Sequence, residues 1–118
     1  MADFTERDLD NIASILDYCD KIIAILNRFE SDYDLFKKDY VFKDALLMNI
    51  FQIGEATNRL SDDCKNYFTD IPWHEIYATR NIIAHGYIKV DDDIIWNIVI
   101  NDIEFIKKRL EEETISNL

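Results

Sequence analysis

Glycine and proline are scarce in this chain, which has two glycines and one proline among 118 residues. These residue types supply the sharp turns of a fold built from many short strands, so such a fold is disfavoured and long helices are favoured. The composition, 48% hydrophobic and 31% charged, is that of a globular protein and excludes a disordered one. The length indicates one domain over residues 1–118, large enough to bury a core.

Cysteine is also scarce, and the two present, Cys19 and Cys64, are not spaced as a Cys-x-x-Cys pair. We therefore expect reduced cysteines in the core of a cytoplasmic protein and no disulfide framework. The polar, acidic N-terminus does not read as a signal peptide, and no apolar run reaches the ~20 residues that span a bilayer. Metal-ligand spacings and glycine-rich phosphate loops are missing too, so we expect neither a metal nor a cofactor.

Positive charge is in short supply, because 24 acidic residues face 13 basic ones and the net charge is -11 at pH 7. This charge disfavours non-specific attraction to nucleic acid or to an anionic membrane and favours a basic partner. An RNA-binding function would therefore need a locally basic cleft or recognition of RNA shape and single-stranded ends.

Apolar residues recur at three- and four-residue steps after Thr5, which predicts an amphipathic helix of about 25 residues. A charged connector over residues 31–39, with room for a short turn of helix, leads to a second helix, from about residue 39 to residue 60. This helix is apolar on most sides, so we expect it to be central or covered by a second subunit. Among its polar exceptions, Glu55 and Arg59 are four residues apart, the spacing of a helical ion pair.

The second half of the chain also predicts helices. Ser61 should cap a short helix to about Phe68, and Pro72 should take the first position of a helix that Gly86 ends in a left-handed conformation. Asp91 to Asp93 should begin the last helix. Its expected core stripe is Ile95, Val99, Ile103, Ile106 and Leu110. With no confident strand, the sequence predicts an all-α fold, an antiparallel four-helix bundle with an additional short helix.

Residues 80–87, Arg-Asn-Ile-Ile-Ala-His-Gly-Tyr, form the candidate site. Arginine is a permanent, planar phosphate binder, and histidine moves protons near neutral pH. Five residues advance an ideal helix by about 140° past a full turn, so Arg80 and His85 share a pocket only if His85 lies at the released helix end. The simpler interpretation is that His85 caps the helix while Arg80 pairs with a carboxylate. The other histidine, His74, is expected at the surface near a helix start.

Three segments in order resemble one family. Four residues match the R-N-x-x-x-H-x-Y pattern of HepT-like toxins of the HEPN superfamily: Arg80, Asn81, His85 and Tyr87. Residues 53–61 resemble the second-helix signature of that family, and the Ile-Pro-Trp of residues 71–73 fits the approach to the motif helix. The helix order covers essentially the whole chain, so the resemblance implies a HEPN-like helical fold.

This resemblance implies a metal-independent endoribonuclease, the toxin of a type II toxin–antitoxin pair, which cleaves an RNA such as tRNA through its 2′-hydroxyl. Arg80 and His85 would be the catalytic residues, and Asn81, Glu55 and Arg59 would support them. The implied antitoxin is a cognate minimal nucleotidyltransferase that attaches AMP to Tyr87. The family also implies a homodimer with two motifs in one cleft.

Two other interpretations of the sequence stay open. The chain could be a non-catalytic helical subunit that binds and regulates a minimal nucleotidyltransferase, or a plain helical dimerisation module. Tyr87 could equally be an ordinary buried aromatic residue. The substitution His85→Ala separates the ribonuclease from the non-catalytic subunit. It should abolish RNA cleavage by a ribonuclease, whereas a non-catalytic subunit should still bind its partner.

Overall fold

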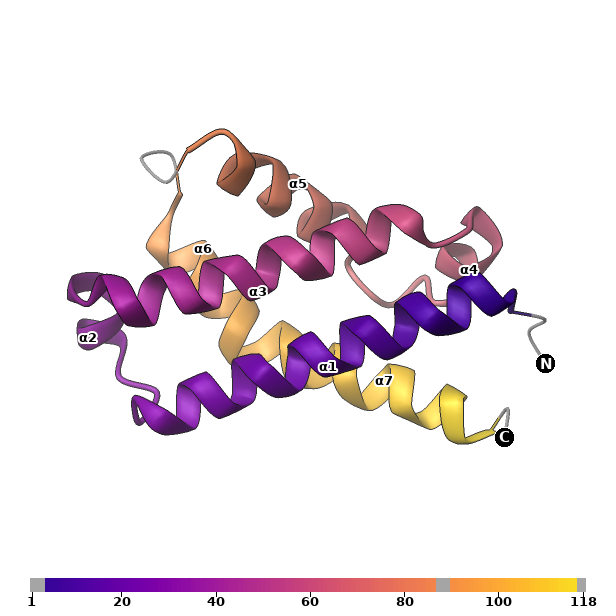
Figure 1. Cartoon of the computed structure of the whole chain (residues 1–118), viewed down its shortest axis with the longest axis horizontal. Coiled ribbons are helices and arrows are strands. Elements are labelled where there is room, and N and C mark those ends of the chain that lie inside the picture. Colours follow the sequence, from indigo (N-terminus) through magenta and orange to yellow (C-terminus); the bar gives the residue numbers. More distant parts are fainter. Residues whose placement is uncertain (1–3, 87–89, 117–118) are drawn as a thin grey trace.

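All regular structure in the described residues, 4–86 and 90–116 of this computed structural model, is helical (Figure 1). The elements in chain order are α1 (Glu6–Arg28), α2 (Tyr33–Lys38), α3 (Tyr40–Arg59), α4 (Asp62–Tyr67), α5 (Trp73–Ala84), α6 (Asp92–Asn97), the π-helical segment η2 (Ile98–Asp102) and α7 (Ile103–Ser116). The predicted all-α fold is confirmed. None of the helices in these ranges is long and apolar enough to cross a membrane.

The bundle is organised around α3, which packs against α1 on one side and α5 on the other, while α7 packs against α1. Figure 1 shows α1 and α3 running in opposite directions along the longest axis of a molecule measuring 45 × 28 × 20 Å. The expected central position of α3 within one subunit is therefore confirmed. Of the apolar residues that predicted this helix, Phe51 is half-buried and the others are buried: Phe42, Leu46, Leu47, Ile50, Ile53, Ala56 and Leu60.

Two helix boundaries differ from the sequence prediction. The charged connector holds a full short helix, α2, because Asp32 caps it and Phe36 is fully buried beneath it. Short α2 thus adds to α4, the one additional short helix that the sequence predicted. Pro72 is the N-cap of α5 and not its first helical residue, and it supplies no side-chain cap.

The last helix contains a turn that the sequence analysis missed. Its predicted core residues, Ile95 to Leu110, are all buried, but the wider π-helical turn η2 separates α6 from α7. The signal was visible in the stripe itself, where Ile95, Val99 and Ile103 follow one another in two steps of four. Two such steps exceed the 3.6-residue period of a regular α-helix, and an extra residue in the turn absorbs the difference.

Both cysteines are free and buried, as expected. Burial raises the pKa of each thiol to about 12, which keeps both protonated and unreactive near neutral pH.

Asp8, in the first turn of α1, is a buried carboxylate. Its side chain is 1% exposed and accepts hydrogen bonds from the Ser61 backbone N–H at 2.8 Å and from Ser61 Oγ at 2.7 Å. Ser61 Oγ in turn accepts from the backbone N–H of Cys64, so Asp8 holds the cap of α4. Burial acts to raise the pKa of Asp8, but hydrogen bonds from Ser61 and Thr5 outweigh it and lower that pKa.

Candidate functional site

Gly54 allows α5 to approach α3 closely at the position of Arg80. A Cβ atom on Gly54 would lie 2.4 Å from Cβ and 2.7 Å from Cγ of Arg80, closer than carbon atoms can pack. Only glycine fits there, so this residue sets where the Arg80 side chain leaves its helix. The sequence analysis did not assign this role, although a lone glycine inside an apolar helix signals a close backbone approach.

Arg80 is anchored on two sides by polar neighbours. Its Nε donates to Oε1 of Glu55 at 2.5 Å, and its Nη1 donates to Oδ1 of Asn81 at 2.9 Å. The guanidinium carbon lies 5.0 Å from the ring centre of Phe51 and 5.8 Å from that of Tyr77. Its Nη2 makes no hydrogen bond within the described part of the chain. The side chain is 24% exposed, so an oriented guanidinium retains donors for an external anion.

The expected ion pair between Glu55 and Arg59 is wrong, because Glu55 binds Arg80 instead. Packing of α5 on α3 brings a half-buried guanidinium beside Glu55, where the pair is better shielded from water than an exposed pair on one helix face. Arg59 is exposed and lines a separate pocket of about 570 Å³ that Arg7 and Asp8 also line. The structure thus brings Arg80, Glu55 and Asn81 together and leaves Arg59 outside that group.

His85 lies at the C-terminal end of α5, as expected. Its backbone N–H donates to the carbonyls of Asn81 and Ile82, each at 3.2 Å, and Gly86 follows with φ +121°, a left-handed value. The imidazole is exposed and forms no hydrogen bond within the described residues, including none to Arg80. The side chain is therefore accessible, and convergence with Arg80 inside one protomer stays a prediction. Tyr87 lies outside the described residues.

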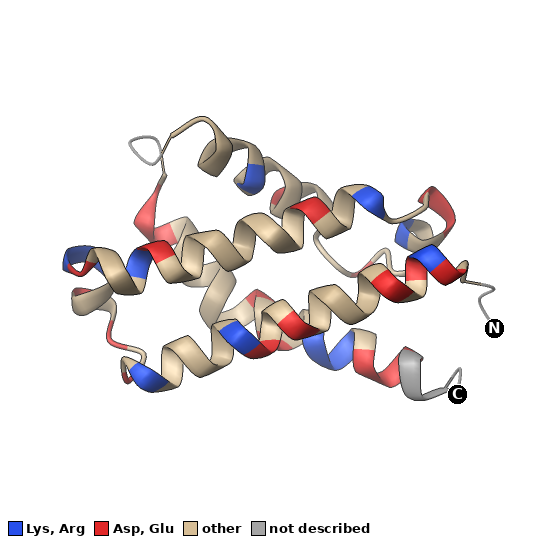
Figure 2. Ribbon diagram, viewed as in Figure 1, with Lys and Arg blue, Asp and Glu red and all other residues tan. Residues whose placement is uncertain are grey.

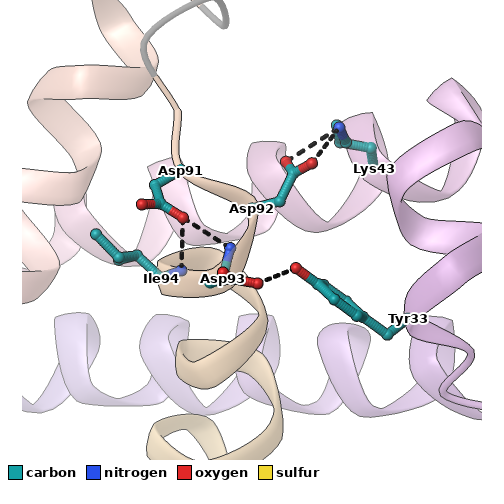
Figure 3. A network of polar contacts seen from close by, with 6 residues as sticks. All are labelled: Tyr33, Lys43, Asp91, Asp92, Asp93 and Ile94. Atoms are coloured by element: carbon teal, nitrogen blue, oxygen red, sulfur yellow. Dashed lines mark hydrogen bonds and ion pairs between the residues drawn. The ribbon is translucent and has the colours of Figure 1, made fainter.

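The three aspartates expected at the start of the last helix all bind the protein itself (Figure 3). Asp91 caps α6 by accepting from the backbone N–H of Asp93 and of Ile94. Asp92 pairs with Lys43 at 3.0 Å, and Asp93 accepts a short hydrogen bond from the Tyr33 hydroxyl. That bond to Asp93 is the main cause that raises the pKa of Tyr33 to about 12. This network fixes α6 against α2 and α3, directly after the candidate site in the chain.

Comparisons with known proteins show the family to which this helical chain belongs. The family described as "Ribonuclease HepT-like" matches residues 15–113, so this chain belongs to the HepT-like family. Among its relatives, "Putative RNase MJ1380" of Methanocaldococcus jannaschii is 34% identical over 80 residues, which cover 68% of this chain and 73% of the relative.

Two further relatives cover more of the chain. "Putative RNase MJ0127" of Methanocaldococcus jannaschii is 30% identical over 104 residues, which are 88% of this chain and 78% of the relative. "Probable ribonuclease HepT" of Thermococcus cleftensis is 28% identical over 105 residues, 81% of this chain and 92% of the relative. No solved structure matches this chain.

Proposed function

We propose that this protein is a metal-independent endoribonuclease, the toxin of a type II toxin–antitoxin pair. The observation that carries the proposal is the anchored Arg80 guanidinium with donors to spare, on the helix that ends in an accessible His85, in a chain of the HepT-like family. An oriented arginine and a free imidazole are the groups that RNA cleavage without a metal requires.

RNA carries its own nucleophile, so the reaction needs no activated water. His85 takes the proton of the 2′-hydroxyl, the 2′-oxygen forms a bond to phosphorus, and the bond from phosphorus to the 5′-oxygen breaks. The leaving 5′-oxygen receives a proton from a general acid, and a 2′,3′-cyclic phosphate remains. Arg80 stabilises the charge that develops on the phosphoryl oxygens, and proton transfer by a positioned histidine contributes ~10²–10⁴ in rate.

One histidine does not readily act as base and acid in the same step. We therefore propose a homodimer whose two-fold axis places both His85 side chains in one cleft, where one is the base and the other the acid. In support, several large apolar residues of α3 and α5 are exposed: Tyr40, Val41, Met48 and Ile82. A C₂ interface buries the same patch on both subunits.

The proposed antitoxin is a minimal nucleotidyltransferase that transfers AMP to the hydroxyl of Tyr87. The modified tyrosine would follow His85 by two residues and would place a phosphate near Arg80, which blocks RNA. Co-expression should add the mass of one adenylyl group to wild-type protein and none to the Tyr87→Phe variant. Full inhibition of unmodified protein by the partner would contradict this part of the proposal.

The decisive experiment incubates purified protein with total RNA in a chelator. Wild-type protein should produce ends with a 2′,3′-cyclic phosphate, and the His85→Ala variant, with an unchanged melting temperature, should not. Cleavage that the chelator abolishes, or equal cleavage by the variant, would refute the mechanism.

The net charge of -11 favours a second candidate function, because such a chain repels RNA over most of its surface. In this alternative, the protein is a non-catalytic subunit that binds and regulates the nucleotidyltransferase. It predicts tight binding of that enzyme by both wild-type and His85→Ala protein, with no RNA cleavage by either.

A further inference from the structure

A pocket of about 390 Å³ lies beside the candidate site, between the end of α3, α4 and the first two turns of α5. Six residues line it: Thr57, Asn58, Lys65, Trp73, His74 and Tyr77. The volume lies within the range of pockets that hold small ligands. A single nucleotide is a ligand of that kind, so size alone admits one.

The lining of this pocket is unusual for so acidic a chain, because it contains no aspartate or glutamate. Three other pockets of the described residues each include at least one carboxylate. The pocket instead offers an imidazole from His74, the aromatic ring of Tyr77 and the ammonium group of Lys65, which lies 3.9 Å from the carboxylate of the exposed Asp62 in a loose, solvated pair. Since carboxylates exclude polyanions, this is the pocket that an RNA strand can enter at the lowest electrostatic cost.

The first turn of α5, at the edge of this pocket, presents unpaired backbone donors. The backbone N–H groups of His74 and Glu75 lack acceptors within the described residues, since Pro72 provides no side-chain cap. Free N–H groups at a helix N-terminus favour anions. His74 lines the pocket, so this helix end can bind a phosphate group there.

Tyr77 connects this pocket to Arg80. Its side chain lines the pocket, and its ring centre lies 5.8 Å from the Arg80 guanidinium carbon. Figure 2 shows basic positions in blue on α5, on α4 and at the α4 end of α3. An anion bound by Arg80 therefore has this pocket as its neighbour along the same side of α5.

We propose that the pocket binds one nucleotide of a single-stranded RNA, next to the nucleotide whose phosphate contacts Arg80. This inference rests on the proposed function, and it names single-stranded RNA as the substrate class. The base packs against the rings of Tyr77 and His74, as unpaired bases do on aromatic side chains. Lys65 and the first turn of α5 bind the phosphate. A paired base cannot enter, so duplex RNA is excluded.

Fluorescence of Trp73 tests this subsite without any cleavage. The chain has two tryptophans, and in the variant Trp96→Phe the remaining one reports on the pocket alone. Trp96 packs among the rings of Tyr33, Phe36 and Phe42, so phenylalanine should be tolerated there. The probe is a hexanucleotide with 2′-O-methyl groups throughout, which lacks the nucleophile. We expect a saturable change in Trp73 emission and, for the duplex of the same sequence, affinity at least ~10-fold weaker.

Charge variants made in the same Trp96→Phe background identify the contact. Lys65→Gln should weaken binding roughly 5–10-fold and reduce the slope of log K against log salt by about 0.7, the value for one phosphate contact on a single strand. Lys108→Gln is the matched control, because Lys108 is exposed on α7 and lines a different pocket. Lys108→Gln should change neither the affinity nor the slope of log K against log salt.

The outcomes separate this inference from the proposed nuclease. No saturable change at Trp73, equal binding of the duplex, or identical affinities of Lys65→Gln and Lys108→Gln would overturn the subsite. If wild-type protein cleaves RNA but Lys65→Gln and His74→Ala leave KM unchanged, the nuclease stands and the subsite falls. If the probe binds as expected but RNA with free 2′-hydroxyls is not cleaved, the subsite stands and the nuclease falls.

Discussion

Because Gly54 has no side chain, α5 can lie close to α3 at the position of Arg80. In most helix interiors, exchanging glycine for alanine stabilises a protein by up to about 1 kcal/mol, because alanine has the better helix propensity. Here the new methyl group would meet Cβ and Cγ of Arg80, so the sign should reverse. We expect Gly54→Ala to cost about 1–3 kcal/mol of unfolding free energy, as overpacking does.

Urea denaturation measures whether Gly54→Ala lowers or raises the free energy of unfolding. Met48→Ala, at an exposed position of the same helix, is the control and should stay within about 0.5 kcal/mol of wild type. A more stable Gly54→Ala protein would mean that α3 and α5 do not approach as closely as the structure has them.

In the proposed nuclease, Glu55 would act through Arg80, as a positioning residue. Its carboxylate accepts from Nε of Arg80 and so fixes the orientation of the guanidinium. A misplacement of about 1 Å at a reacting group can cost 10²-fold in rate. We therefore expect Glu55→Ala to lower kcat by about 10-fold or more.

The conservative variant separates geometry from charge at this position. Glu55→Gln keeps an acceptor for Nε, so its kcat should remain within about threefold of wild type. Steady-state kinetics on a single-stranded RNA measure kcat for both variants. Equal losses in the two variants would show that the negative charge of Glu55, and not its hold on Arg80, is what matters.

At the scale of elements, Asp8 joins the start of α1 to the cap of α4. The folded protein lowers the pKa of Asp8 below its ordinary value of 3.8. A carboxyl of lowered pKa stabilises the fold above its unfolded pKa, and this contribution is lost as the pH falls through the folded pKa. Near neutral pH, Asp8→Asn should cost about 1–3 kcal/mol, because it disturbs a buried, charge-assisted set of hydrogen bonds.

The pH dependence is the sharper part of this prediction. The stability difference between wild type and Asp8→Asn should shrink as the pH falls below 3.8, the ordinary pKa of the carboxyl, and should level off once the pH passes the lower pKa of folded Asp8. Denaturation at pH 7 and pH 3 measures it, with the exposed Asp10→Asn as a control. A difference that is the same at both pH values would show that the carboxylate charge does not hold α1 to α4.

Apolar periodicity predicted the helices, because burial repeats along one chain segment and needs no partner to be recognised. Two helix starts were equally visible: Ser61 and Asp91 each accept a backbone N–H where a helix was expected to begin. Thr5 also caps α1, a role that was not predicted from the sequence. Contacts between helices were harder to predict from the sequence. The pairing of Glu55 with Arg80 depends on how α5 packs on α3, and sequence spacing suggested Arg59 instead. Local pattern thus predicted the elements, and packing chose the partners.

At the scale of the whole molecule, the acidic charge limits where RNA can bind. Many basic side chains are already paired with carboxylates, as Lys107 is with Asp20 and Arg109 is with Asp70. Arg80 is paired too, but its guanidinium has more donors than Glu55 can use. An acidic surface repels RNA, so in the proposed nuclease RNA should bind where hydrogen-bond donors remain without partners.

The proposed use of two histidines in one cleft makes a quantitative prediction for mixed dimers. If base and acid come from different protomers, a dimer of one wild-type and one His85→Ala chain lacks one of them and is inactive. Random mixing of equal amounts then leaves about one quarter of the dimers active, whereas independent sites would leave about one half of the activity. Two different affinity tags isolate the mixed dimer directly, and light scattering should give twice the chain mass of 14.0 kDa. A mixed dimer with half the wild-type activity would mean that each protomer completes its own site, and the general acid would then have to be a group other than the second His85.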